Sequence, residues 1–340
     1  METEQKSDIL FVGFNQNADC FACGTESGFK IFNTDPFKNT FSRDLDGGIG
    51  IVSMLFRCNI LALSGGGSNP RYNPDRVMLW DDSQSKCIGE LKFKSEVKAI
   101  KMNKETIVVV LEDRIYVYEF LSLKISDAIE TWTNPDGLCC LSSMKDTNVL
   151  VCPDKEQGMI RIINNGNQET VKAHDGSIAS LSLSPDATKC ATASDKGTLV
   201  RIFDTSTATK LQEVRRGADP AKIYSIAFSS NDLLAVSSDK GTVHVFGLKT
   251  SEEKKKEETS KNTTSYFGFM KGVLPEYFSS EWSFAQFKFN EDSDSTYTAC
   301  AFTDNNSLVL VSKKGDYYLL EVDKEGKTIT KKAHLMVNSE

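Results

Sequence analysis

The sequence predicts an all-β protein: a seven-bladed β-propeller of four-stranded antiparallel blades that follow one another contiguously along the chain. Three observations predict this fold. A turn-and-strand pattern recurs about every 40–45 residues, short alternating segments fill the intervals, and no stretch shows the periodicity of an ordinary helix. A repeat of this length with four short strands per unit is typical of propeller blades.

The clearest repeat is a glycine turn that leads into a β-branched strand. Ser194-Asp-Lys-Gly-Thr198 recurs 44 residues later as Ser238-Asp-Lys-Gly-Thr242, with weaker copies at Thr25-Glu-Ser-Gly28 and Ser312-Lys-Lys-Gly315. The copy at 312 marks the seventh blade. The expected ends of the third strands mark the other six, at Phe32, Trp80, Tyr118, Ile163, Phe203 and Phe246.

Each blade is expected to consist of four strands that are contiguous in sequence, and no N-terminal strand is expected to join the last blade to close the ring. The first blade would use residues 9–14, 20–23, 29–32 and 37–41, and the last would end with residues 328–332. Turn residues at 64–74 lengthen the second blade. One domain, 8–335, therefore accounts for the chain, with flexible tails at 1–7 and 336–340.

An insertion is expected within blade six, at residues 249–279, because the last two copies of the turn lie 74 rather than 44 residues apart. Its first part, to Lys261, is charged and typical of disorder. Its second part is apolar but rich in helix breakers, so it is expected to insert into a membrane through Phe267, Phe269, Met270 and Leu274. Trp282, just beyond, is expected to pack on the propeller.

Composition excludes several classes of function. The net charge of −7 and pI of about 5.3 argue against nucleic-acid binding and against adhesion to anionic membranes by bulk attraction. The polar N-terminus lacks the features of a secretory signal and no apolar run is long enough for a membrane span, so a cytoplasmic protein is expected.

No metal site, cofactor or catalytic centre is expected. Cys20 and Cys23 have C-x-x-C spacing, but three residues apart on a strand they would point to opposite faces. No nucleophile elbow, phosphate-binding glycine loop or metal motif is present, so the chain is not expected to be an enzyme. A propeller hydrolase would require a cluster of carboxylate or histidine side chains at the axis, which one sequence does not reveal.

The strongest candidate for binding is Arg215-Arg216-Gly217, which follows the expected fourth strand of blade five. Consecutive residues of an extended segment point to opposite sides, so each arginine is expected to face the cleft shared with a different neighbouring blade. The two best repeats supply hydroxyl and basic side chains around them. Guanidinium groups with hydroxyl donors suit a phosphate monoester, whereas the alternative is two solvated arginines before a turn.

Through this motif the chain resembles the PROPPIN family, in its shorter WIPI branch. These propellers bind polyphosphoinositides through an aromatic residue or leucine followed by Arg-Arg-Gly; here Val214 occupies the first position, a departure. The other stretches that carry the resemblance are Phe14–Gly24, Asn33–Pro36, Asn69–Asp81 and Tyr277–Trp282.

The resemblance implies two headgroup pockets on the rim of blades five and six. The first would use His174, Thr192, Ser194, Gly197, Thr198, Arg201 and Arg215. The second would use Arg216, Gly217, Ser238, Thr242 and His244. For His174 a second interpretation stays open, the structural histidine of WD-type blades.

The resemblance also implies ligands, partners and a location. The ligands are phosphatidylinositol 3-phosphate and phosphatidylinositol 3,5-bisphosphate, and the role is that of a membrane-recruited scaffold in autophagosome formation. A monomer would lie peripherally on autophagosome-precursor and endosomal or lysosomal/vacuolar membranes. An autophagic lipid-transfer protein is the expected partner, near Asn15 and Asn17. The alternative is a WD-repeat interaction scaffold that binds no lipid.

Overall fold

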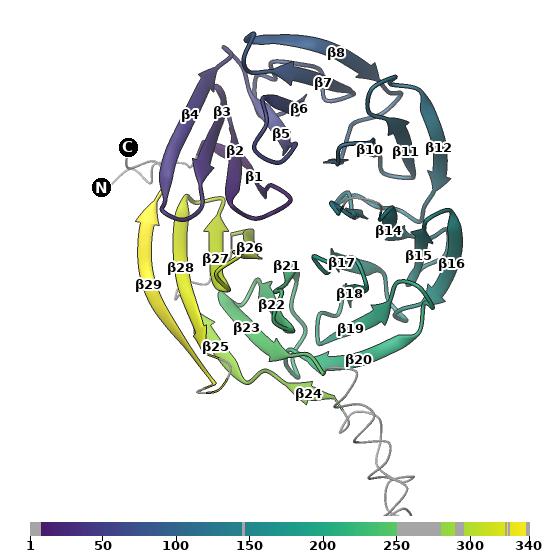
Figure 1. The fold of residues 1–340 in the computed structure, drawn as a ribbon, viewed down its shortest axis with the longest axis vertical. Helices are drawn as coiled ribbons and strands as arrows, with labels where there is room; N and C mark the ends of the chain where they lie inside the picture. The colour runs from purple at the N-terminus through teal and green to yellow at the C-terminus, as the bar shows by residue number, and fades with distance from the viewer. Residues whose placement is uncertain are drawn as a thin grey trace, which may run out of the picture.

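A ring of seven sheets surrounds a central axis in the computed structural model, which describes residues 8–144, 147–249, 280–289, 296–323, 325 and 327–337 (Figure 1). Each sheet has four antiparallel strands in chain order from the axis to the rim, except that blade five carries one extra strand. The described residues contain no helix, so none of them forms a helix that could cross a membrane. The seven-bladed prediction is confirmed.

The first four blades contain these strands: β1 (Ile9–Phe14), β2 (Cys20–Thr25), β3 (Gly28–Asn33), β4 (Lys38–Asp44); β5 (Ile49–Met54), β6 (Ile60–Gly65), β7 (Arg76–Asp81), β8 (Lys86–Lys92); β9 (Ala99–Met102), β10 (Thr106–Val110), β11 (Arg114–Glu119), β12 (Ile125–Glu130); and β13 (Cys140–Leu141), β14 (Val149–Pro153), β15 (Met159–Asn164), β16 (Asn167–Lys172).

The last three blades contain these strands: β17 (Ile178–Leu183), β18 (Lys189–Ser194), β19 (Leu199–Asp204), β20 (Lys210–Arg215), with β24 (Glu281–Trp282) added at its edge; β21 (Ile223–Phe228), β22 (Leu233–Ser238), β23 (Thr242–Gly247), β25 (Ala285–Lys288); and β26 (Thr298–Phe302), β27 (Ser307–Ser312), β28 (Asp316–Asp323), β29 (Thr328–Met336).

The repeated glycine turn connects the second and third strands of a blade. In blades five and six Gly197 and Gly241 adopt positive φ values of 61° and 65°, a conformation that costs an L side chain about 1–2 kcal/mol. The β-branched residues that follow begin buried strands, β19 and β23. The repeat is therefore the sequence signature of one hairpin, which is why it marks the blades so well.

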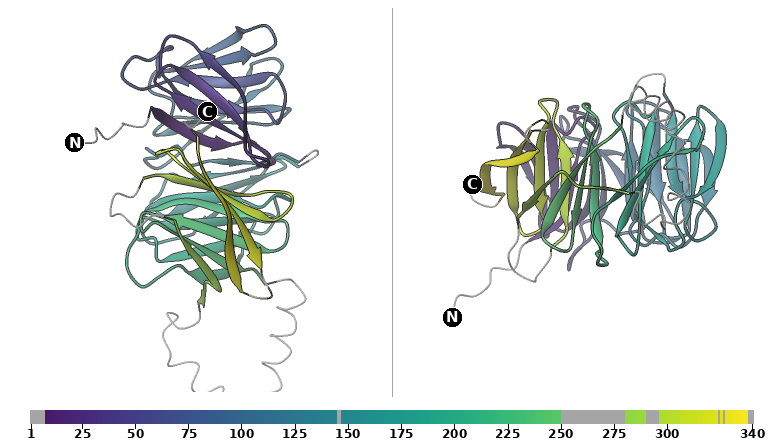
Figure 2. Two further views of the ribbon diagram at one scale, coloured as in Figure 1. Left: turned by 90° about the vertical axis from the view of Figure 1, so that its left-hand side faces the viewer. Right: turned by 90° about the horizontal axis from the view of Figure 1, so that it is seen from below.

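The hydrophobic core is divided into clusters between adjacent blades, which close the disc-shaped ring seen from the side in Figure 2. Cys20 packs in the cluster with blade two and Cys23 in the cluster with blade seven, which confirms that they lie on opposite faces of their strand. The four antiparallel strands of each blade follow one another along the chain, as expected, whereas the added strand β24 of blade five comes from between β23 and β25 of blade six.

The ring closes between blades one and seven without strand exchange. Their shared cluster includes Phe21 and Tyr317, and the Tyr317 hydroxyl donates to the backbone oxygen of Thr34 over 2.6 Å. The expected C-terminal tail from 336 differs in the structure, because β29 runs to Met336 and Val337 is buried in this cluster.

Candidate functional site

The two arginines of the Arg-Arg-Gly segment leave the end of β20 in opposite directions. Val214 packs in the core between blades five and six, so strand alternation directs Arg215 to the other face, which Glu213 shares. Arg215 is 3% exposed and Arg216 6% exposed. Both arginines are therefore buried, and the alternative of two solvated arginines before a turn does not describe this segment.

Arg216 is held by backbone oxygens. Its amide donates to the oxygen of Thr198 over 2.9 Å, its Nε donates to the oxygen of Gly197 over 3.0 Å, and its Nη2 donates to the oxygen of Asp219. In the described part of the chain Arg216 forms no ion pair, although the nearby carboxylates of Asp239 and Asp219 stabilise its charge. The guanidinium is thus fixed in position by neutral acceptors.

The other members of the second predicted pocket gather from blade six. Ser238 ends β22, and Thr242 and His244 lie on β23. Burial, and next the charge of Arg216, lower the pKa of His244 to about 4, so this ring is neutral at pH 7 and lies near Arg216. His244 Nδ1 is 3.2 Å from Ser283 Oγ. The structure therefore places Arg216 near His244, one of the blade-six members of the second predicted pocket.

The first predicted pocket lies toward blade four. Arg201 on β19 donates through Nε to Glu213 over 2.8 Å and through Nη1 to the backbone oxygen of Ala173 over 2.6 Å. Ser280 donates to the second oxygen of Glu213, also over 2.6 Å. Burial raises the pKa of Glu213, but the hydrogen bonds from Ser280 and Arg201 outweigh it and hold the pKa below its usual value. Glu213 is thus a carboxylate that orients Arg201.

His174 and Thr192, two further members of the first predicted pocket, lie next to Arg201. His174 is 4% exposed, and its Nε2 is 2.8 Å from the Thr192 hydroxyl. Burial, and next the charge of Arg201, lower the pKa of His174 to about 4. A neutral, buried ring bonded to a neighbouring strand matches the structural interpretation of His174. The residues near the Arg215 end of the blade are Ser194 at the end of β18, Gly197 and Thr198 in the turn, and Arg201.

Two glycines shape the approach to both arginines. A Cβ at Gly197 would lie 1.8 Å from the backbone oxygen of Ala221, so only glycine allows the 194–198 turn to contact the segment that follows the arginines. A Cβ at Gly217 would meet nothing within 4 Å. Gly217 therefore leaves open space beside Arg216, whereas Gly197 provides a close contact.

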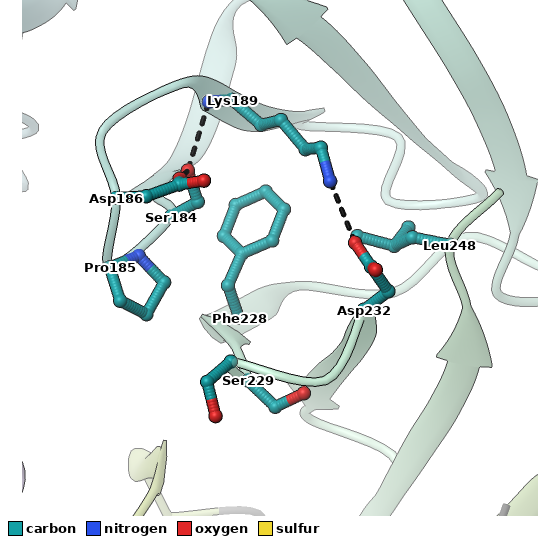
Figure 3. Close-up of a pocket in the computed structure, with 9 residues that line it drawn as sticks. Ser184, Pro185, Asp186, Lys189, Phe228, Ser229, Asp232 and Leu248 are labelled. Atoms are coloured by element: carbon teal, nitrogen blue, oxygen red, sulfur yellow. Dashed lines mark hydrogen bonds and ion pairs between the residues drawn. The ribbon is translucent and has the colours of Figure 1, made fainter. Parts of the chain in front are cut away.

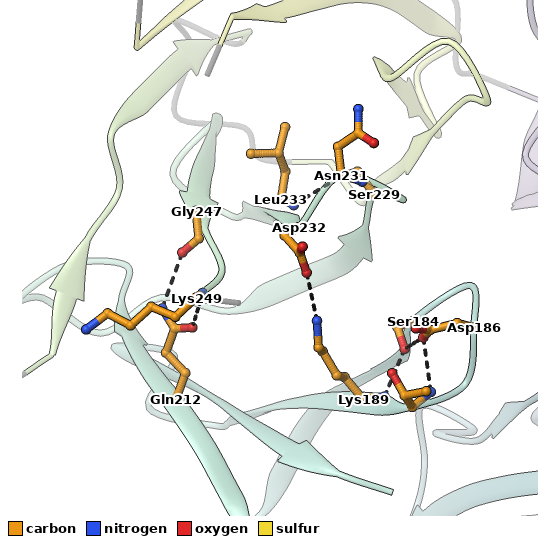
Figure 4. Close-up of polar contacts among 11 residues, drawn as sticks. Ser184, Asp186, Lys189, Gln212, Ser229, Asn231, Asp232, Leu233, Gly247 and Lys249 are labelled. Atoms are coloured by element: carbon orange, nitrogen blue, oxygen red, sulfur yellow. Dashed lines mark hydrogen bonds and ion pairs between the residues drawn. The ribbon is translucent and has the colours of Figure 1, made fainter. Parts of the chain in front are cut away.

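Both ends of the insertion are tied to the edge of β20. The side chain of Gln212 donates to the backbone oxygen of Gly247 and accepts from the amide of Lys249, over 3.2 and 3.0 Å (Figure 4). It also donates to Glu281 over 3.1 Å, in the strand β24 that pairs in parallel with β20. The predicted membrane residues Phe267, Phe269, Met270 and Leu274 lie outside the described residues.

Two cavities among the described residues are alternative candidates for a site. One of about 140 Å³ lies between the hairpins of blades five and six (Figure 3), but its single cation, Lys189, is neutralised by Asp232 at 2.7 Å. The axial channel has a volume of about 670 Å³, and among its described lining residues Asp136 is the only carboxylate and histidine is absent. The channel thus lacks, in the described part, the clustered acids or histidines that a hydrolase would need.

The described residues also contain no group of three or more potential metal ligands. Of the two residues predicted to contact a protein partner, Asn15 is 7% exposed and its side chain bonds to Asp19 and Phe56 within the protein. Asn17 is exposed in the same turn. A partner surface in this turn remains a prediction and would depend on Asn17.

Four residues that lie around the pockets were not predicted there from the sequence: Glu213, Ser280, Ser283 and Trp282. Glu213, Ser280 and Ser283 contact predicted pocket residues directly. Trp282, expected to pack on the propeller, is instead 58% exposed, because β24 lies on the outer edge of blade five with nothing beyond it among the described residues. No local sequence pattern predicts a parallel strand of two residues, so β24 could be found only in the structure.

Comparison with known proteins covers nearly the whole chain. The PROPPIN family model matches residues 9–336. Autophagy-related protein 18e of Arabidopsis thaliana is 40% identical over 329 residues, which span 94% of this chain and 86% of that protein. Autophagy-related protein 18 of Dictyostelium discoideum is 35% identical over 333 residues, 92% of this chain and 88% of that protein.

Solved structures agree with the fold. The structure of Kluyveromyces lactis Hsv2 superposes with a TM-score of 0.78 at 25% sequence identity, covering 97% of this chain and 99% of that one. The likeness therefore extends around the ring rather than resting on single blades.

Proposed function

The chain belongs to the PROPPIN family of autophagy-related β-propellers, and on this premise we propose that it binds phosphatidylinositol 3-phosphate and phosphatidylinositol 3,5-bisphosphate through two rim pockets. It acts as a binding protein and not as an enzyme. Arg215, with Arg201, Ser194 and Thr198, forms the first pocket; Arg216, with Ser238, Thr242 and His244, forms the second.

A single observation carries the proposal: two consecutive arginines are almost fully buried and point into the clefts on opposite sides of blade five. Burying a charged guanidinium is costly, so buried arginines are retained where they form a specific contact or serve a ligand. Arg216 is bound by backbone oxygens, which fix its position and leave its charge available to a phosphate. Guanidinium groups bind phosphate in a planar, bidentate manner.

The acidic net charge makes local pockets necessary. A chain of charge −7 is repelled by an anionic membrane at long range, so recruitment must depend on short-range contacts with individual headgroups. Two pockets on one rim, joined by a predicted insertion that enters the bilayer, would act together through effective concentration. The propeller would then bind the membrane by its edge.

This mode of binding supports a role in autophagosome formation. The protein would be a monomer recruited to autophagosome-precursor and endosomal or lysosomal/vacuolar membranes. Edge-on binding leaves the blades on the opposite side of the ring exposed to the cytoplasm, where an autophagic lipid-transfer protein would dock. Asn17, in the first turn of blade one, is the described residue that this interaction would involve.

The test is co-flotation with liposomes that each carry one phosphoinositide. The wild type is expected to bind liposomes with 3-phosphorylated lipids, and the Arg215→Thr, Arg216→Thr double variant is expected to lose this binding. The matched control is Arg57→Thr, Arg114→Thr, which removes the same charge from exposed arginines of blades two and three, 51% and 40% exposed in their side chains.

Thermal unfolding of each variant verifies that it is folded. If the double variant floats as well as the wild type, or if the control loses binding equally, the two-pocket mechanism is wrong. If the folded wild type floats with none of the phosphoinositide liposomes, the lipid-independent scaffold is the better interpretation.

A further inference from the structure

The short segment 280–283 connects the two pockets across the rim of blade five. Ser280 donates to Glu213, which orients Arg201 of the first pocket, over 2.6 Å. Ser283 lies 3.2 Å from His244 of the second pocket. Between them, β24 is fixed along the last residues of β20. The backbone of this segment is thereby held at both ends and along its length.

The register of this pairing places one large side chain beside the first pocket. Val214 pairs with Glu281 and Arg215 with Trp282, in parallel. Paired residues of parallel strands point to the same face of a sheet, so Trp282 shares the face of Arg215. Ser280, two residues earlier, lies on that same face and contacts Glu213, which supports the assignment independently.

Trp282 is nevertheless 58% exposed, the larger exposure of the two exposed tryptophans. The third, Trp80, is buried. A single exposed indole is ordinary in itself, but this one is held on a paired strand beside the first pocket, where a bilayer bound at that pocket would cover it. Indoles prefer the membrane–water interface, where the ring contacts apolar groups and its N–H stays hydrated.

We infer that Trp282 is a membrane contact of the rigid propeller, which enters the headgroup region of the bilayer beside a lipid bound at Arg215. The inference rests on the proposed function, because a headgroup in the first pocket brings the bilayer surface next to the indole. It concerns a described residue of the rim, which follows the predicted insertion and is not one of the residues predicted to insert. The partner is a phosphoinositide-containing lipid surface.

The experiment compares Trp282→Ala with Trp132→Ala, a matched change at the other exposed tryptophan, which is 42% exposed and lies between blades three and four. Affinity is measured for liposomes that contain phosphatidylinositol 3-phosphate and, by calorimetry, for soluble inositol 1,3-bisphosphate. Trp282→Ala is expected to weaken liposome binding by about tenfold, the change that partial burial of one large apolar side chain supports. Binding of the soluble headgroup should stay unchanged, and Trp132→Ala should alter neither.

A direct readout uses fluorescence. In a Trp132→Phe variant, Trp282 and the buried Trp80 are the remaining tryptophans. Liposomes with brominated acyl chains should quench the emission of Trp282 but not that of the buried Trp80, since quenching by bromine requires close approach to the lipid. Unchanged liposome affinity in Trp282→Ala, or no quenching, overturns the inference.

Two further outcomes separate this inference from its premise. If Trp282→Ala loses the soluble headgroup as well, Trp282 is a wall of the pocket and the bilayer contact is wrong while the proposed function stands. If the wild type binds neither the liposomes nor the soluble headgroup, the proposed function fails and the inference fails with it.

Discussion

Replacing Gly197 with alanine tests whether the 194–198 turn positions the arginines. Gly197 has a φ of 61°, its backbone oxygen accepts from Arg216 Nε over 3.0 Å, and a Cβ there would lie 1.8 Å from the oxygen of Ala221. Because this neighbouring atom belongs to the backbone, no side chain can rotate away to make room. The segment 216–221, which contains the hydrogen-bonded Arg216, must shift instead.

The magnitude follows from two separate costs. Left-handed backbone costs an alanine about 1–2 kcal/mol, and overpacking against a fixed neighbour costs about 1–3 kcal/mol. Gly166→Ala is the matched control, because Gly166 has a φ of 86° but a Cβ there would meet nothing within 4 Å. The free energy of unfolding should therefore fall by about 1–2 kcal/mol in Gly166→Ala and by about 2–5 kcal/mol in Gly197→Ala.

The assay is urea unfolding of both variants, followed by liposome flotation under conditions where both are folded. Gly166→Ala should bind liposomes as the wild type does, whereas Gly197→Ala should bind more weakly, because Arg216 has moved. Equal destabilisation of the two variants would refute the steric argument. Full liposome binding by a destabilised Gly197→Ala would refute the link between the turn and Arg216.

Three other predictions concern pH, ring closure and the root of the insertion. Burial lowers the pKa of His174 from 6.5 in the unfolded chain to about 4 in the folded one, so the unfolded chain binds more protons between these pH values. The free energy of unfolding should therefore be highest above pH 6.5 and fall by up to about 3 kcal/mol as the pH is lowered to 4. A urea midpoint that does not change between pH 7 and 5 would contradict this prediction. Tyr317→Phe removes the hydrogen bond to Thr34 between blades one and seven and should lower the free energy of unfolding by about 1–2 kcal/mol in urea; an unchanged midpoint would show that this bond does not stabilise the closed ring. Gln212→Ala releases Gly247, Lys249 and Glu281 from β20 and should weaken liposome binding more than binding of soluble inositol 1,3-bisphosphate; equal losses would place Gln212 in a pocket instead.

The fold could be predicted because each blade repeats a local rule. The glycine of the Ser-Asp-Lys-Gly-Thr turn adopts a positive φ in both copies, and a strand of buried β-branched residues follows. The end of the chain was harder to predict. Val337 is buried in the apolar cluster between blades seven and one. This contact joins opposite ends of the sequence, so no local pattern predicts it.

The site could be predicted in part, for the same reason. Arg215 ends β20 and Arg216 continues the extended segment, so their opposite directions follow from alternation alone. His174 could not be assigned, because only the 2.8 Å contact with Thr192 distinguishes a structural ring from a ligand-binding one. Trp282 was expected to be buried, and its exposure depends on a parallel pairing across 67 residues, from 215 to 282.

In the proposed mechanism, one extended segment serves two pockets, and this arrangement would have a thermodynamic consequence. Because Arg215 and Arg216 leave the same backbone in opposite directions, the distance between the two bound headgroups is set by the thickness of one blade and not by a flexible linker. A rigid spacing makes the second headgroup bind as an intramolecular event, at an effective concentration of about millimolar or more. In the proposed mechanism, the two arginines would therefore contribute separately to binding a soluble headgroup but jointly to binding a membrane. The loss of either one would remove one site in solution and most of the affinity on a bilayer.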